Sequence, residues 1–164
     1  MTIDHNPLLG AWQLVRWEIT YGDGRAPSLP YGEHASGLIV YSGDGYMSAC
    51  IAAAGRARLS SASVRSAPQA ERLAAFESYF QYAGSYALRR VDGGRLQVVH
   101  SVSHSLNPNF VGSEQVRDVA FDAAGRLTLS ASDRVPNSEV ARHHWLIWQR
   151  VAADGRPVSG QGQQ

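Results

Sequence analysis

Hydrophobic and polar residues alternate in short stretches along most of the chain, and turns rich in Gly and Asp separate these stretches. Val, Ile, Leu, Trp and Tyr dominate them, and most of these residues favour β-strands. Gly lies in three of the turns, so tight hairpins are expected there. Consecutive hairpins predict an antiparallel meander. The pattern predicts eight strands, at residues 11–21, 36–41, 46–51, 84–91, 95–105, 113–121, 127–132 and 143–151.

One segment, residues 68–82, departs from this alternation and predicts a short helix between the third and fourth strands. Ser66 and Gln69 have the spacing of a capping box, and Pro68 suits the first turn of a helix. We expect the helix either to close one mouth of a barrel or to lie on its outside. The apolar residues that recur at helical spacing are Leu73, Phe76, Tyr79, Phe80 and Ala83.

The remaining segments predict connections and one domain. Residues 22–34 and 52–66 have no clear period and are expected to be long loops. A single all-β domain over residues 6–152 is predicted, and a disordered tail over residues 153–164. Eight strands is the number at which a closed up-and-down barrel becomes just wide enough to hold one small ligand.

Composition and charge exclude several classes of function. The formal net charge is +1 and the arginines are scattered, so no nucleic-acid partner is expected. Cys50 is the single cysteine, which rules out an internal disulfide. No signal-peptide pattern and no apolar run of about 18 residues is visible, so we expect a cytoplasmic protein with no membrane partner. A homodimer is left open.

A family resemblance emerges at the first predicted strand. Gly10-Ala11-Trp12, followed by Leu14 and Val15, resembles the entry of lipocalins and fatty-acid-binding proteins. The resemblance implies that Trp12 plugs the closed end of a barrel and that Arg150 stacks over it. From about residue 6 to residue 151 the chain is similar to the bacterial and fungal lipocalin-like domain family. The residues that carry this similarity are Leu9–Val15, Gly37–Tyr41, Asp44–Ala49, Gly84–Tyr86, His100, Pro108–Arg117, Arg126–Leu129, Trp148 and Arg150. Calycin-type barrels of this kind bind small molecules, and no cofactor is implied.

Strand alternation predicts which side chains face the interior. If Trp12 points inward, Arg16 and Glu18 do too. They then form either a solvated ion pair near the open mouth or part of the pocket lining. On the third strand we place Tyr46 and Ser48, with Cys50, on the corresponding face. Tyr86 is a further candidate for the pocket, where its phenol would need a partner.

The fifth strand predicts an inward face with two imidazoles, made by Val98, His100, Val102 and His104. Residues four apart on a strand are about 13 Å apart, too far for two ligands of one metal ion, so no metal site is expected. His100 is the best single candidate for acid/base chemistry, oriented by Glu18 or Tyr86. The alternative is that His100 is hydrogen-bonded inside the barrel and takes no part in catalysis.

The sixth and eighth strands complete the predicted pocket. Gln115, Arg117 and Val119 share one face of the sixth strand. Arg117 either binds a carboxylate or enolate oxygen or has a structural role, in which it locks strand ends or pairs with Glu18. On the last strand, His144 and Trp148 share the face that brings Arg150 to Trp12.

Three functions remain open at this point. The preferred one is binding of a small, largely apolar metabolite, similar to a polyketide, terpenoid or fatty acid. The second is a cofactor-independent isomerase, cyclase or dehydratase of natural-product biosynthesis, with His100 as acid/base and Arg117 stabilising an oxyanion. The third is a structural or interaction protein whose barrel is filled by its own side chains.

Overall fold

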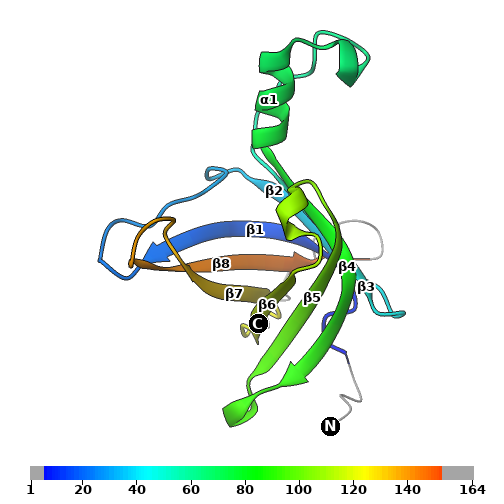
Figure 1. Ribbon diagram of the computed structural model, residues 1–164. Coiled ribbons are helices and arrows are strands. Elements are labelled where there is room, and N and C mark those ends of the chain that lie inside the picture. Colours follow the sequence, from blue (N-terminus) through cyan, green and yellow to red (C-terminus); the bar gives the residue numbers. More distant parts are fainter. Residues whose placement is uncertain (1–5, 153–164) are drawn as a thin grey trace, which may run out of the picture.

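The computed structural model describes residues 6–152 as a closed antiparallel barrel (Figure 1). Each strand pairs with its neighbours in sequence, and β8 pairs with β1 to close the barrel. The predicted eight-stranded up-and-down barrel is confirmed, and so is the short helix between the third and fourth strands. The strands are β1 (Gly10–Tyr21), β2 (Ser36–Tyr41), β3 (Tyr46–Ala52), β4 (Tyr79–Arg90), β5 (Leu96–Ser105), β6 (Glu114–Phe121), β7 (Leu127–Arg134) and β8 (Ala141–Arg150).

The C-terminal tail and membrane-spanning segments were also considered in the sequence-based predictions. The tail predicted at residues 153–164 lies outside the described residues. Among residues 6–152, no helix is long and apolar enough to cross a membrane.

One end of the barrel is closed by a buried tryptophan. Trp12 is 1% exposed, and its indole N–H donates to the carbonyl oxygen of Leu8 at 2.8 Å. The guanidinium of Arg150 lies 4.1 Å from the centre of the Trp12 ring and donates to the carbonyl of Pro7 at 2.8 Å. This is the arrangement that the family resemblance implies. It ties the segment before β1 to the end of β8.

The helix is shorter than predicted. α1 covers Gln69–Glu77, and β4 begins at Tyr79, so the expectation of helix up to residue 82 is wrong. Residues 79–83 pair with β3 instead, because strand pairing over a long sequence distance outweighs a local helical spacing. The capping box is also wrong. The N-cap residue is Pro68, which makes no side-chain cap, and Ser66 lies in the short 3₁₀ helix η1 (Val64–Ser66).

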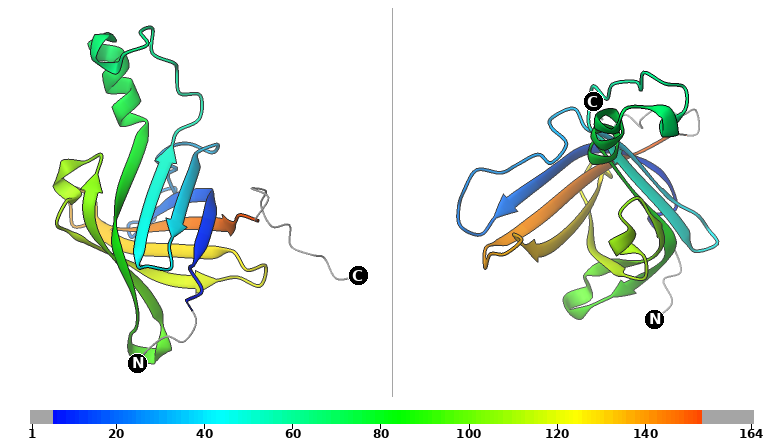
Figure 2. Two further views of the ribbon diagram at one scale, coloured as in Figure 1. Left: turned by 90° about the vertical axis from the view of Figure 1, so that its right-hand side faces the viewer. Right: turned by 45° about the horizontal axis from the view of Figure 1, so that its top comes forward.

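α1 projects beyond the ends of β3 and β4 and stands away from the barrel (Figures 1 and 2). None of its residues is buried, and Leu73 and Phe76 are exposed. The loop before it holds it in place: Arg56 donates to the carbonyl of Ala75 at 3.0 Å, and the Ser60 N–H donates to Glu71 at 2.8 Å. The helix does not close the mouth of the barrel, since no residue of α1 lines the cavity, and it projects past the strand ends without packing on the barrel's outer surface.

β-bulges change the inward face along two strands. In β1 the pairing with β8 shifts between Leu14 and Arg16, so Trp17 faces the interior while Arg16 and Glu18 face outward, where they pair with each other. The prediction that Arg16 and Glu18 point inward is therefore wrong. An extra residue in one strand reverses the alternation that follows it.

The same effect occurs in β5, opposite Ala83 and Gly84. The shift turns His104 out of the barrel, where it is exposed and hydrogen-bonded to Ser103 at 2.9 Å. The prediction that His104 faces the interior is wrong for this reason.

On β3 the opposite face is the inner one. Met47, Ala49 and Ile51 are buried, whereas Tyr46 is 62% exposed and Ser48 is exposed. Residues paired across neighbouring strands share a face of the sheet. The buried Ile39 and Tyr41 of β2 are paired with Ala49 and Met47, so these two residues of β3 face inward. The prediction that Tyr46 and Ser48 face inward is therefore wrong.

Gly84 is required where β4 crosses the bulge of β5. A Cβ atom at this position would lie 1.9 Å from the carbonyl oxygen of Ser101, far closer than any real contact. We expect Gly84→Ala to lower the free energy of unfolding by about 1–3 kcal/mol in urea denaturation, because the two backbones would have to separate. Gly43→Ala is the matched control, since nothing lies within 4 Å of a Cβ there. Equal effects of the two substitutions would contradict the close approach.

Candidate functional site

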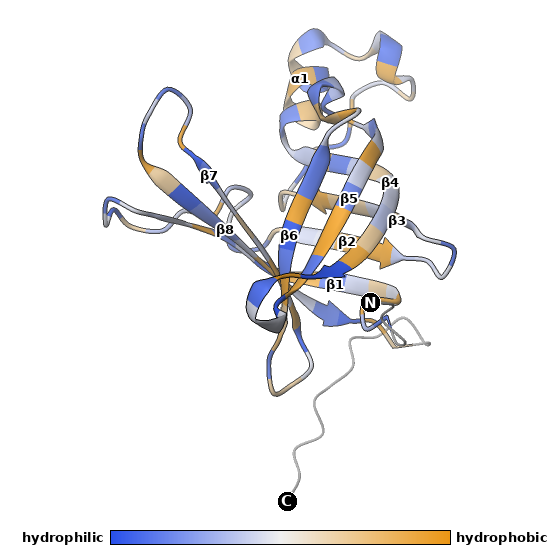
Figure 3. Cartoon of the chain, turned by 60° about the horizontal axis from the view of Figure 1, so that its bottom comes forward, coloured by the Kyte–Doolittle hydropathy of each residue, from blue (hydrophilic) through white to orange (hydrophobic). Residues whose placement is uncertain are grey.

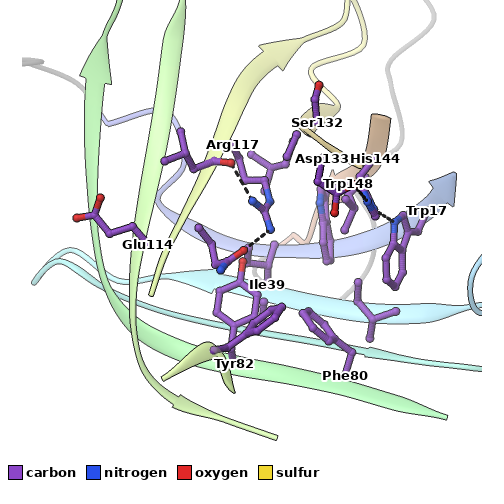
Figure 4. Close-up of a pocket in the computed structure, with 18 of the residues that line it drawn as sticks. Trp17, Ile39, Phe80, Tyr82, Glu114, Arg117, Ser132, Asp133, His144 and Trp148 are labelled. Atoms are coloured by element: carbon purple, nitrogen blue, oxygen red, sulfur yellow. Dashed lines mark hydrogen bonds and ion pairs between the residues drawn. The ribbon is translucent and has the colours of Figure 1, made fainter. Parts of the chain in front are cut away.

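A cavity of about 480 Å³ lies inside the barrel (Figure 4), and Trp12 is not among the residues that line it. Part of the cavity wall is formed by the strand ends that lead into the β3–β4, β5–β6 and β7–β8 connections. The cavity therefore lies at the open end of the barrel. A barrel filled by its own side chains would leave no such space. The lining residues are Trp17, Ile39, Ala49, Ile51, Phe80, Tyr82, Phe110, Glu114, Gln115, Val116, Arg117, Leu129, Ala131, Ser132, Asp133, Arg142, His144, Leu146 and Trp148.

One side of the cavity is aromatic. Phe80 lies at the centre of this group, with ring centres 6.2 Å from Trp17, 5.6 Å from Tyr82 and 5.8 Å from Phe110. None of these four residues was predicted to line the pocket. Trp17 faces inward through the β1 bulge, Phe80 was assigned to the helix, and Phe110 lies in a 3₁₀ turn, η3 (Pro108–Phe110), between β5 and β6.

A polar cluster on β7 and β8 adjoins the aromatic side at Trp17. Arg142 donates to Asp133 at 2.8 Å, and Nε2 of His144 lies 3.2 Å from the same carboxylate. The indole N–H of Trp17 donates to Nδ1 of His144 at 3.4 Å, so the ring proton of a neutral His144 is on Nε2. The hydrogen bond from Arg142 lowers the pKa of Asp133, and burial lowers the pKa of His144. Figure 3 shows the outer parts of β7 and β8 as hydrophilic.

Arg117 lies on β6, in the wall of the same cavity. Its guanidinium donates to the carbonyl of Val116 at 2.8 Å and to the side-chain oxygen of Gln115 at 3.2 Å. The Gln115 amide in turn donates to the hydroxyl of Ser113 at 2.9 Å. No carboxylate of residues 6–152 forms an ion pair with Arg117. The alternative in which Arg117 pairs with Glu18 is therefore wrong, since Glu18 pairs with Arg16.

His100 is fully buried in the barrel interior and does not line the cavity. Both ring nitrogens are hydrogen-bonded to tyrosines, Nε2 to the Tyr41 hydroxyl at 2.8 Å and Nδ1 to the Tyr82 hydroxyl at 2.7 Å. Burial, together with the charge of Arg117, lowers the pKa of His100 from 6.5 to about 3. The orienting partners are thus Tyr41 and Tyr82, not Glu18 or Tyr86. The imidazole is neutral at physiological pH, and Tyr82 separates it from the cavity.

The other candidate residues fall into two groups. Gln115, Arg117, His144 and Trp148 line the cavity together. Tyr86 does not, since its hydroxyl donates to the carbonyl of Ser42 at 2.8 Å and accepts from Asn6 at 2.7 Å. The candidates Val98, Val102 and Val119 pack into the core beside the cavity.

Among the described residues, no three His, Cys, Asp or Glu side chains gather in a way that could hold a metal ion.

Comparison with known proteins agrees with this architecture. An uncharacterized protein, YLR301w from Saccharomyces cerevisiae, has a similar crystal structure, with a TM-score of 0.54 and 14% sequence identity. The match covers 94% of this chain and 60% of the yeast chain, so the present chain spans less than two thirds of that protein, and the likeness concerns the fold alone. No curated protein was found with a similar sequence. The lipocalin-like domain matches residues 9–151. The chain therefore belongs to the lipocalin-like domain family.

Proposed function

We propose that the cavity binds a small, largely apolar organic molecule, similar to a polyketide, terpenoid or fatty acid. A lipocalin-like barrel suggests small-molecule binding, and the space of about 480 Å³ beside an aromatic wall is the observation that carries the proposal. Ligand sites in proteins have volumes of roughly 300–1,000 Å³, with apolar walls and a few polar groups that fix orientation. This cavity has both kinds of wall.

Binding has more support than the alternative of a cofactor-independent isomerase, cyclase or dehydratase. That alternative assigned the acid/base role to His100. His100 lies behind Tyr82, uses both nitrogens within the protein, and has a pKa far below neutrality. A group in this position holds two tyrosines in place and does not reach a ligand in the cavity.

The proposal predicts that filling the cavity with a large side chain weakens ligand binding. Ala131 lines the cavity on β7, so Ala131→Trp should place an indole in the ligand's space and weaken binding at least tenfold. A panel of fatty-acid-, terpenoid- and polyketide-like compounds is screened by thermal shift. A compound at about 100 times its Kd should raise the Tm by roughly 5–10 °C.

The matched control is Ala87→Trp on the exposed face of β4. It adds the same side chain outside the barrel and should leave binding unchanged. A panel that produces no shift in the wild-type protein would count against the proposal. Equal loss of binding in both variants would show that the ligand is not in the cavity.

A further inference from the structure

We infer that the molecule held in the cavity carries an anionic oxygen group, a carboxylate or an enolate, which the Arg117 guanidinium binds. The inference rests on the proposed binding function and adds to it the chemistry of the ligand's polar end. Gln115 is a positioning residue, because its side-chain oxygen accepts from the Arg117 Nη2 group and its amide is held by Ser113.

The balance of charge in the cavity supports this inference. Of the charged residues that line it, Asp133 and Arg142 neutralise each other through a direct ion pair. Within the described part of the chain, Arg117 donates to neutral oxygens alone, those of Val116 and Gln115. Glu114 lies at the rim, and Figure 4 shows its carboxylate directed away from the guanidinium. A half-buried cation without a counter-charge is costly, and an anionic ligand relieves that cost.

The geometry of the guanidinium also suits an anion. Arginine has five N–H donors, and the two bonds to Val116 and Gln115 use one N–H on each Nη nitrogen. The remaining N–H groups can donate to a carboxylate, whose two oxygens match the planar guanidinium. The aromatic wall formed by Trp17, Phe80 and Phe110 lies in the same cavity and accommodates an apolar tail. The site therefore fits an amphipathic acid.

The test compares two probes with the same tail, sodium decanoate and 1-decanol, by isothermal titration calorimetry at pH 7.5. A charge-assisted hydrogen bond should make decanoate bind roughly 10–100 times more tightly than decanol. In Arg117→Gln this preference should disappear, with decanol affinity little changed. Arg89→Gln is the control, because Arg89 lies on the exposed face of β4 and its side chain bonds, among residues 6–152, to Gln97 alone.

The outcomes separate this inference from the proposed function. Equal binding of the two probes to the wild-type protein would overturn the anion site and leave the proposed function standing. Binding of neither probe would overturn the inference that the site holds an amphipathic acid, whereas the proposed function is overturned only when the whole compound panel produces no thermal shift. If Arg117→Gln does not fold, ¹³C NMR of carboxyl-labelled decanoate bound to the wild-type protein replaces it. The pKa of the bound carboxyl should be lower than that of the free acid, and an unchanged or raised pKa would overturn the inference.

Discussion

Replacing Trp12 by Ala should lower the free energy of unfolding by about 3–5 kcal/mol, the range for truncating a large buried aromatic side chain. Trp12 is 1% exposed and fills the closed end of the barrel. The substitution also removes the indole donor to Leu8 and the ring beneath the guanidinium of Arg150. Urea denaturation followed by far-UV circular dichroism measures the loss.

Trp145→Ala provides the matched control. Trp145 is 41% exposed on the outer face of β8, where its indole N–H donates to the Thr20 hydroxyl at 3.1 Å. Truncating it should cost about 1 kcal/mol or less, since little packing is lost. A similar cost for both substitutions would contradict the role of Trp12 as the plug of the barrel.

Lowering the pH should begin to destabilise the protein near pH 6.5, above the pH range in which carboxylates titrate. Burial lowers the pKa of His100 from 6.5 to about 3, so between these values the unfolded chain takes up a proton that the folded protein does not. The unfolded state binds more protons in this window, and stability therefore falls as the pH falls. The loss should reach about 2–3 kcal/mol between pH 6.5 and pH 4.5, at slightly more than 1 kcal/mol per pH unit.

His100→Gln isolates this contribution, because the amide can still donate and accept hydrogen bonds toward Tyr41 and Tyr82 but does not titrate. The unfolding free energy of this variant is measured from pH 8 to pH 4.5. It should fall by about 2–3 kcal/mol less over this range than the unfolding free energy of the wild-type protein. His144 has a pKa that burial also lowers, and it contributes in the same direction in both proteins. Identical pH dependence in the two proteins would mean that His100 is not a buried neutral group.

Much of the fold could be predicted from the sequence because the barrel depends on local signals. Alternation of apolar and polar residues located eight strands, and the Gly-containing turns joined them in order. Each predicted strand corresponds to an observed one, with most boundaries within one or two residues. The largest boundary error, at the start of β4, arose where aromatic residues have a spacing that suits a helix and a strand equally well.

The orientation of side chains was harder to predict, and the reason is physical. Alternation holds only while the pairing between strands is regular, and the bulges in β1 and β5 each add one residue. No local signal marks Val15 as the additional residue of β1, since its exposure depends on how β8 pairs with β1. Residues beyond a bulge, including Trp17 and His104, were therefore assigned to the wrong face.

The polar residues of the cavity could be predicted from the sequence only in part. Arg117 and His144 lie on strands with regular alternation, and their inward direction follows from it. Asp133 and Arg142 were missed because β7 and β8 extend further than their apolar residues suggest. The ends of both strands are polar and resemble loop in sequence. Their pairing across the hairpin, Asp133 opposite Arg142, forms strand from residues that alone would not favour it.

Residues 53–78, which connect β3 to β4 and include α1, contribute little to the stability of the barrel, since no residue of α1 is buried. Ala52 and Tyr79 are paired directly across these two strands, so the chain leaves the sheet and returns to it at the same point. A tight hairpin could join the two residues, and all eight strands and the cavity wall would keep their places. Residues 53–78 are thus a natural position for grafting: a foreign peptide or a second domain inserted there would be carried at the rim of the barrel without passing through its core.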